Sequence, residues 1–279
     1  MKITCVKPFS SSKRGKQLLK SGLFSDICIR IEGTSFRCHK IILACASEFF
    51  EKLFQNDGLT TGEVTLEETT PEIFQIFLDF IYDPVDNQAL ESLSPEVLMS
   101  LMKCANMWLA EDFVDKCASI LISQREHMQP ETLISLFAVS YEMDHKPLMV
   151  QTIEILKDSW RSAMDDRATV KMNIGCFVEY FENTYNVFRP RRRFKMIENW
   201  VKENNYVRNS PLDWKAITEI VKSIQFQELS VEEFYNGPGK SNILSDSEKF
   251  EILYRVARAG CHCMSTVKSD LMLADAEDK

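Results

Sequence analysis

Two short segments of this chain hold residue types that could bind a phosphate or a metal ion. Residues 237–241 read Gly-Pro-Gly-Lys-Ser and end as a phosphate-binding loop does, with a lysine that could reach phosphate oxygens. The full pattern requires a glycine five positions before Gly239, where this chain has Phe234, and it follows a strand, whereas a helical pattern precedes this segment. Residues 261–263 read Cys-His-Cys, but neighbouring side chains cannot all point at one ion. We therefore interpret the first segment as a loop between helices and expect no metal site and no cofactor.

One cysteine and one histidine could form a thiol nucleophile and its base. Cys45 follows His39 by six positions, inside an apolar stretch with helical spacing. A nucleophile also needs a group that orients the base and donors that stabilise an oxyanion, and no such groups can be named here. We expect Cys45 to be a packed, inert thiol, and the chain to have no catalytic residue and not to be an enzyme.

One basic cluster stands out, formed by Arg189, Arg191, Arg192, Arg193 and Lys195. It could contact an acidic partner or direct nuclear import. It could also be the solvated start of a helix, although positive charge at that end opposes the helix dipole. The sequence leaves these alternatives open.

Composition limits the classes of partner. The 279 residues are 45% hydrophobic and 27% charged, which is typical of a folded globular chain. The net charge of −8 argues against direct binding of nucleic acid. No apolar run approaches the roughly 18 residues that cross a bilayer, so no membrane contact is expected. Nine scattered cysteines without paired spacing fit a reducing compartment, and we expect the chain in the cytoplasm, the nucleus or both.

The first half of the chain begins with strand patterns and continues with helical ones. A short amphipathic helix is predicted within residues 11–23, limited by Gly22, and residues 26–38 predict a hairpin with Ile27, Ile29 and Ile31 on one face. The helical stripe that follows runs from Ile42 to Leu53, and a short strand is predicted at 63–66. Thr-Pro at 70–71 and Ser-Pro at 94–95 predict the starts of two further helices, and a last helix carries the apolar residues of 113–121.

The second half shows helical stripes only. Four helices are predicted around residues 133–141, 148–160, 194–201 and 217–224. Ser230 with Glu233, and Ser245 with Glu248, are capping-box patterns that predict two further helix starts. The predicted fold is therefore α+β in the first half and all-α in the second, and mostly α overall.

Residues 39–54, HKIILACASEFFEKLF, resemble the signature H-[RK]-x-[VI]-L-A-x-x-S-x-[FY]-F-x-x-[LM]-F of the BTB (POZ) domain. Ser25-Asp26 before this segment and residues 71–82 after it lie at the intervals of that family. The resemblance covers residues 18–123 and implies a short sheet flanked by helices. It also implies a homodimer, whose apolar contacts would be Leu18, Leu19, Leu23 and Phe24, with Asp26 and Lys40 as a charged pair near the interface. Packing of the leucines on their own chain is the alternative.

The resemblance further implies an adaptor that brings substrates to a cullin-3 ubiquitin ligase, with cullin contacts at Phe54, Leu59, Thr61 and Tyr82. Tight cullin binders of the family carry a hydrophobic-x-Glu motif, and here Leu59 is followed by Thr61 in place of the glutamate. Asp83-Pro84 also replaces the usual Thr-Gly. The alternative is a BTB-dimer scaffold or a transcriptional or cytoskeletal regulator that does not bind cullin. The substrate or partner protein is unknown from the sequence.

Residues 197–202 (IENWVK), 226–234 (FQELSVEEF) and 241–246 (SNILSD) resemble the BACK domain, a helical module that follows BTB domains. The resulting division is an N-terminal extension at 1–17, a BTB domain at 18–125, a BACK domain at 126–258 and an acidic polar tail at 259–279, expected to be disordered. Nine glycines leave no room for kelch repeats of roughly 50 residues with paired glycines, so none is expected.

Overall fold

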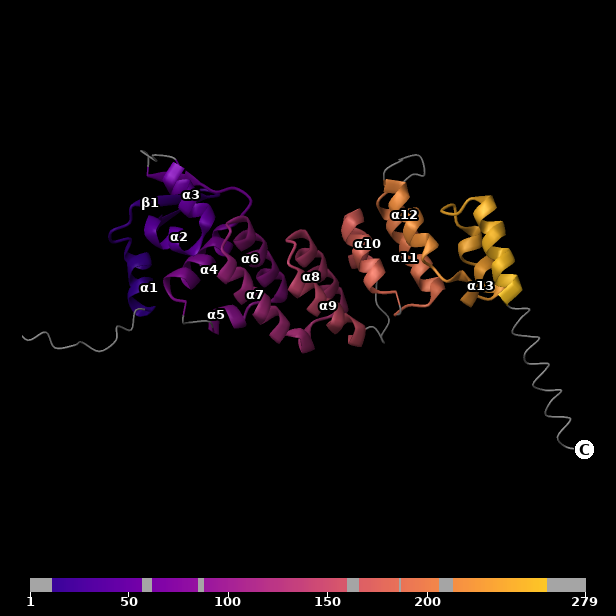
Figure 1. Cartoon of the computed structure of the whole chain (residues 1–279). Helices are drawn as coiled ribbons and strands as arrows, with labels where there is room; N and C mark the ends of the chain where they lie inside the picture. Colours follow the sequence, from indigo (N-terminus) through magenta and orange to yellow (C-terminus); the bar gives the residue numbers. More distant parts are fainter. Residues whose placement is uncertain are drawn as a thin grey trace, which may run out of the picture. The chain divides into compact units, whose positions relative to one another are not determined.

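The computed structural model describes residues 12–56, 62–84, 88–159, 166–185, 187–205 and 213–259 (Figure 1). The chain divides into two compact units, Met1–Thr152 and Ile153–Lys279. The division lies inside helix α9 (Lys146–Ser159) and not after residue 125, because α8 (Pro130–Glu142) packs on α6 (Pro95–Met107) of the first unit. The predicted boundary between a BTB and a BACK domain stays a prediction.

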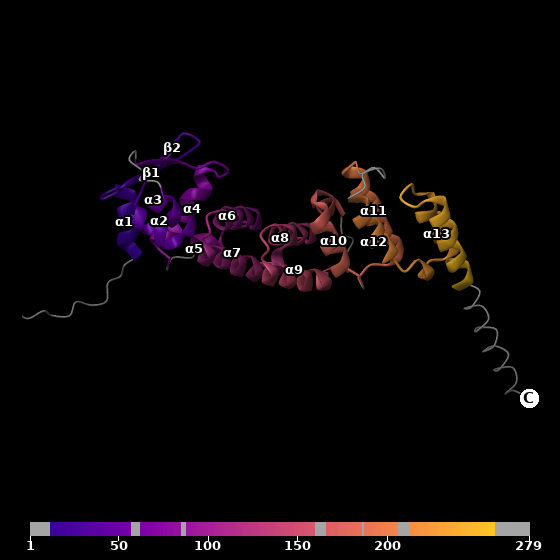
Figure 2. The same ribbon diagram turned by 45° about the horizontal axis from the view of Figure 1, so that its top comes forward.

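A three-stranded sheet in the order β2-β1-β3 begins the first unit. Strands β1 (Ile27–Ile31) and β2 (Thr34–Cys38) pair antiparallel, with Ile31 opposite Thr34. The two turn residues, Glu32 and Gly33, have φ angles of 47° and 84°, the positive values that a tight two-residue hairpin requires. Strand β3 (Glu63–Thr65) pairs parallel to β1 on the other side. The hairpin prediction is confirmed, and in Figure 2 the sheet lies along one side of α2, α3 and α4.

Helices make up the rest of the first unit. In addition to α6, α8 and α9, they are α1 (Ser12–Ser21), α2 (Lys40–Ala46), α3 (Glu48–Asn56), α4 (Pro71–Tyr82), α5 (Gln88–Glu91), α7 (Glu111–Ser123) and the 3₁₀ turn η1 (Arg125–His127). Thr70 and Ser94 cap α4 and α6 as predicted, since their hydroxyls accept hydrogen bonds from the backbone N–H groups of Ile73 and Val97. Because α1 begins at Ser12, the predicted extension at 1–17 overlaps the first helix.

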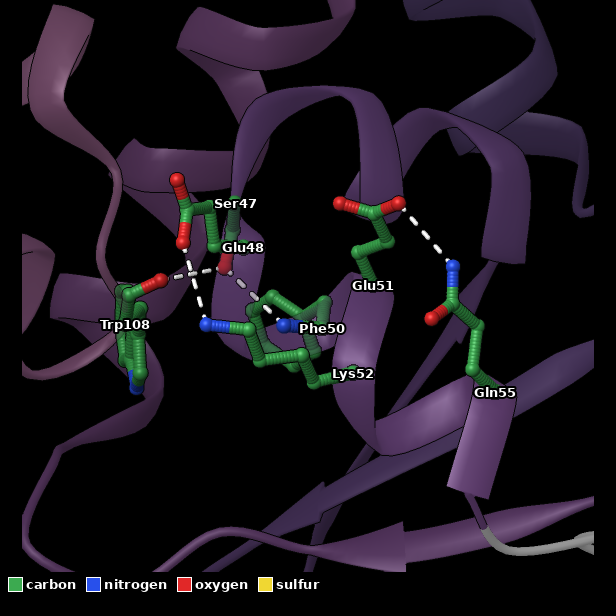
Figure 3. Close-up of polar contacts among 7 residues, drawn as sticks. All are labelled: Ser47, Glu48, Phe50, Glu51, Lys52, Gln55 and Trp108. Atoms are coloured by element: carbon green, nitrogen blue, oxygen red, sulfur yellow. Dashed lines mark hydrogen bonds and ion pairs between the residues drawn. The ribbon is translucent and has the colours of Figure 1, made fainter.

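The helical stripe predicted from Ile42 to Leu53 is two helices, interrupted at Ser47. This residue is extended (φ −157°, ψ 121°), and its hydroxyl donates to the carbonyl of Trp108 and accepts from the N–H of Phe50 at 3.1 Å (Figure 3). The first N–H groups of a helix have no carbonyl acceptor within the helix, and the Ser47 hydroxyl supplies an acceptor for one of them at the start of α3. The stripe was continuous in sequence because both helices turn their apolar sides toward the same core.

That core is aromatic. Phe50, Phe74, Phe77 and Phe113 have exposed fractions of 0–1% and Trp108 3%, and the Phe77 and Trp108 ring centroids lie 4.9 Å apart. Each such side chain contributes roughly 1.5–3 kcal/mol by leaving water. This cluster, with the buried isoleucines of β1, supports the helices that carry the surfaces described below.

The second unit is helical throughout its described residues. It contains α10 (Ile174–Asn183), α11 (Pro190–Glu203), α12 (Asp213–Lys222), α13 (Val231–Tyr235), a final helix at 246–259, and the 3₁₀ turns η2 (Asp166–Lys171), η3 (Phe226–Glu228) and η4 (Pro238–Lys240). Trp200 organises its core: the indole N–H donates to the carbonyl of Met172 at 3.0 Å, and its ring stacks on Phe177 with centroids 5.0 Å apart. Helix α10, which starts at the cap Asn173, was not predicted.

Both predicted capping boxes are confirmed. Ser230 and Glu233 exchange their two hydrogen bonds, and so do Ser245 and Glu248. The segment at 237–241 is confirmed as a loop with the short turn η4, and its lysine donates to Asn236 at 3.1 Å. In the described residues, no helix combines the length and the apolar composition that a bilayer crossing demands.

Candidate protein-interaction surfaces

Tyr82, predicted as a cullin contact, is a buried structural residue with an exposed fraction of only 4%. Its hydroxyl accepts from the backbone N–H of His39 at 3.0 Å and lies 2.7 Å from Nδ1 of the same histidine. Nε2 of His39 lies 2.8 Å from the carbonyl oxygen of Leu23, which can only accept, so in the neutral ring Nε2 carries the proton and Nδ1 accepts from the tyrosine. The prediction for Tyr82 is wrong. Its side chain points into the unit because its hydroxyl hydrogen-bonds to the buried groups of His39.

This network fixes the segment between α1 and β1, where large apolar side chains face outward. The exposed fractions of Leu23 and Phe24 are 56% and 79%, and Ile41 on α2 is 73% exposed. Leu18 and Leu19 on α1 are half-buried. Ile41, in the signature segment 39–54, is a further exposed apolar side chain, and the dimer interface stays a prediction.

Asp26 and Lys40, predicted as a charged pair, are in contact through one backbone group. Oδ1 of Asp26 accepts from the backbone N–H of Lys40 at 2.7 Å and so caps α2 from outside the helix. The Lys40 ammonium lies 5.9 Å from the ring centroid of Phe54. Among the described residues, the two side chains form no ion pair with each other.

Helix α1 is held against the end of α4 by a close backbone approach at Gly15 and by an ion pair of Lys16, neither of which was predicted. A Cβ added to Gly15 would overlap the carbonyl oxygen of Tyr82, so only glycine permits this approach. The Lys16 ammonium lies 3.3 Å from Asp83, which is 5% exposed. Asp83, half of the Asp83-Pro84 departure from the family pattern, therefore anchors α1.

Helix α3 presents a polar outer face. Lys52 pairs with Glu48 at 3.2 Å and Gln55 donates to Glu51 at 3.0 Å, both one turn apart (Figure 3). Phe54 is half-buried against Phe50, with ring centroids 6.0 Å apart. Leu59 and Thr61, the other two predicted cullin contacts, lie outside the described residues.

Cys45 is exposed, which corrects its prediction as a packed residue. It lies on the outer side of α2, one turn after Ile41. His39 bonds to Tyr82 and Leu23, so it does not serve this thiol as a base. Burial raises the pKa of Cys38 and of Cys117 to about 12, which makes both thiols inert at neutral pH. The residues that the structure describes contain no group of three or more potential metal ligands.

The basic cluster at the start of α11 is not one exposed patch. Arg189, Arg191 and Lys195 are exposed, and Lys195 pairs with Glu198 at 2.8 Å. Arg192 lies over the ring of Phe188 at 4.6 Å. Arg193 is only 3% exposed, so its assignment to a surface patch is wrong. As the fourth residue after the helix cap, it points back over the preceding turn into the unit.

Comparison with known proteins matches residues 16–125 to the BTB/POZ domain. Similar curated proteins include zebrafish (Danio rerio) Kelch-like protein 41a, 22% identical over 224 residues, which covers 76% of this chain and 34% of that protein. Kelch repeat and BTB domain-containing protein 2 of cowpox virus (strain Brighton Red) is 24% identical over 201 residues, covering 70% of this chain and 34% of the relative. The protein of the same name from Pongo abelii is 31% identical over 112 residues, 39% of this chain and 17% of the relative.

The chain thus spans about a third of the length of the first two relatives. Among solved structures, the BTB domain of zebrafish PATZ1 aligns with 25% identity and a TM-score of 0.35, covering 42% of this chain and 98% of that domain. The hairpin, the stacked helices around Phe50 and Phe77, and the match to the family model agree. The N-terminal part of this chain, residues 16–125, is a BTB/POZ domain.

Proposed function

We propose that this chain is a non-enzymatic adaptor that pairs with a second copy of itself through its BTB domain and holds other proteins. The observation that carries the proposal is the high exposure of three large apolar side chains, Leu23, Phe24 and Ile41, on segments that hydrogen bonds join to each other. Scattered single apolar residues on a surface are ordinary, whereas a group of large ones on a rigid support favours an interface. The support here is rigid because His39 and Asp26 bond the α1–β1 connection to α2.

Self-association can be tested by measuring the molar mass of the protein in solution. Ile41→Asp would place a charge in the centre of the paired surface, where burying it without a partner is costly. We expect light scattering on a sizing column to give a dimer for the original chain and a monomer for Ile41→Asp. Val150→Asp is the matched control, since Val150 is 59% exposed on α9 of the same unit and should leave the dimer intact. A monomeric original chain at micromolar concentration refutes the dimer.

Cys45 offers a second, independent measurement of the same surface. Its thiol is exposed in the single chain, one turn from Ile41, so pairing through α2 should cover it. We expect iodoacetamide to modify Cys45 several-fold faster in Ile41→Asp than in the original chain, with Cys117 slow in both. Equal rates at Cys45 would show that the partner does not cover α2.

We propose further that the adaptor presents α3 to a cullin-3 ubiquitin ligase. Support comes from the outward-facing polar residues of α3, from the half-buried Phe54, and from the Kelch-like relatives. A pull-down with cullin-3 tests this idea, with Glu51→Arg as a disrupting variant on the outer face of α3. If the folded dimer retains no cullin, the alternative of a scaffold that works without a ligase replaces the cullin proposal.

The helical second half is proposed to be a BACK domain. The similarity to the zebrafish relative extends over 224 residues, beyond the 110 residues that the BTB match covers (16 to 125). The described helices around Trp200 supply the packed module that such a domain needs. In this proposal, that half spaces bound proteins from the BTB dimer.

A further inference from the structure

Arg193 is buried in the second unit between two aromatic rings. The guanidinium carbon lies 3.8 Å from the ring centroid of Phe181 and 5.3 Å from that of Tyr185. Nη1 donates to the carbonyl oxygen of Phe181 at 3.2 Å. These contacts hold the guanidinium plane in one orientation.

The other two nitrogens of Arg193, Nε and Nη2, have no hydrogen-bond partner although both are buried. Their N–H bonds share one edge of the guanidinium and run parallel, which is the geometry that holds both oxygens of a carboxylate. Burial lowers the pKa of Arg193 to about 10, so the group still carries its charge at neutral pH. A charged group with two unmet donors costs folding free energy unless an anion reaches it.

Space for that anion exists beside Arg193. A cavity of about 270 Å³ is lined by Arg193, Tyr185, Arg189, Gln225 and Glu228, among others. Arg189 and Glu228 also line a neighbouring hollow of about 880 Å³. The first cavity is larger than one water molecule requires and has room for an acidic side chain.

The neighbouring hollow adds a row of cations at the start of α11. Arg189, Arg191, Arg192 and Lys195 line it, together with the two carboxylates of Glu228 and Glu233, so four positive side chains face two negative ones. No acidic residue lies in the first turn of α11, and Arg189 at its cap makes no side-chain capping bond. The positive end of the helix dipole therefore adds to the positive side chains.

We propose that this site binds an acidic segment of a partner protein, with one carboxylate on the Nε and Nη2 edge of Arg193 and flanking carboxylates on Arg189 and Arg191. Glu228 borders both hollows, and its charge disfavours a phosphate dianion more than a single carboxylate. The site lies in the second unit and is independent of the BTB surface. It gives the adaptor a place to select proteins by an acidic motif.

Fluorescence polarisation with the full chain tests the proposal. The probe is a fluorescein-labelled peptide with three consecutive glutamates between glycines, and its matched control carries glutamines instead. We expect the glutamate peptide to bind and the glutamine peptide to bind at least tenfold more weakly. Arg193→Lys keeps the charge but removes the two-pronged edge, and should weaken the glutamate peptide at least tenfold. Arg255→Lys, on an exposed arginine of the same unit, should leave binding unchanged.

Further measurements distinguish binding of an acidic segment from binding of phosphate and from failure of the dimer. Inorganic phosphate at millimolar concentration should compete poorly; if phosphate binds and the peptide does not, the acidic-segment proposal is overturned. Equal affinities for Arg193→Lys and the original chain overturn it as well. If Arg193→Lys unfolds, the Nε signal of Arg193 in a ¹⁵N nuclear magnetic resonance spectrum provides the test, because it must shift when the peptide is added. Ile41→Asp should bind the peptide as the original chain does, so failure of the dimer and failure of this site are distinguishable.

Discussion

Replacing Tyr82 by phenylalanine should destabilise the first unit strongly, although the change removes a single oxygen atom. The hydroxyl is the bonding partner of two buried groups of His39, the backbone N–H at 3.0 Å and Nδ1 at 2.7 Å. Each buried group left without a partner costs about 1–3 kcal/mol, and the gain from a more apolar ring offsets part of that cost. We expect a loss of about 2–4 kcal/mol in the free energy of unfolding.

Thiol labelling measures this loss in the first unit alone. Cys38 and Cys117 are buried there and react only when the unit opens. When reclosing is faster than the reaction, the labelling rate follows the population of the open state, so about 2 kcal/mol raises the rate roughly 30-fold. Mass spectrometry of the alkylated peptides reads both cysteines separately.

The control is Tyr141→Phe. Tyr141 is half-buried on α8 of the same unit, and its hydroxyl makes no hydrogen bond in the described part of the chain. We expect a change within about 0.5 kcal/mol for this variant, as for most substitutions without a lost contact. If Tyr82→Phe labels no faster than Tyr141→Phe, the assignment of the His39 network as a structural anchor is refuted.

Three further predictions concern α1, residue 61 and α13. Gly15→Ala should push α1 off the carbonyl of Tyr82 and cost about 1–3 kcal/mol or more, seen as a lower melting temperature and a weaker dimer; an unchanged dimer would contradict the close approach. Thr61→Glu should strengthen cullin-3 binding by about 1.5–3 kcal/mol, roughly 10- to 150-fold in Kd by calorimetry, because it adds a charge-assisted hydrogen bond; no gain would remove residue 61 from the proposed contact. The pKa of Glu233 is lowered from its usual 4.5, chiefly by the backbone N–H of Ser230, so this cap is intact above the usual glutamate range and is lost as the pH falls through the lowered pKa. A carboxyl titration followed by nuclear magnetic resonance should have its midpoint below 4.5; a midpoint at or above that value would contradict the capping box.

Local patterns in the sequence determined most of the elements and the family. The alternation of Ile27, Ile29 and Ile31 predicted a strand with one buried face, and these residues are 0–3% exposed. Ser230 and Glu233 predicted the helix start that the structure confirms. Such features depend on neighbours a few positions away, so the chain order alone carries them. Helix α10 was not predicted, although its cap Asn173 and the helical spacing of Phe177 and Phe181 are visible in the sequence.

Tertiary structure decided which of the signature residues face the solvent. Ile41 and Cys45 lie in an apolar stretch yet are exposed, while Tyr82 and Arg193 were placed on the surface and are buried. Helical spacing says which residues share a face, but not which face meets the core. The fate of a long polar side chain depends on partners far along the chain, such as His39 for Tyr82, 43 positions away. The sequence therefore identified the BTB domain, whereas only the packed chain showed which of its apolar side chains are exposed and that one edge of the buried Arg193 guanidinium has no hydrogen-bond partner.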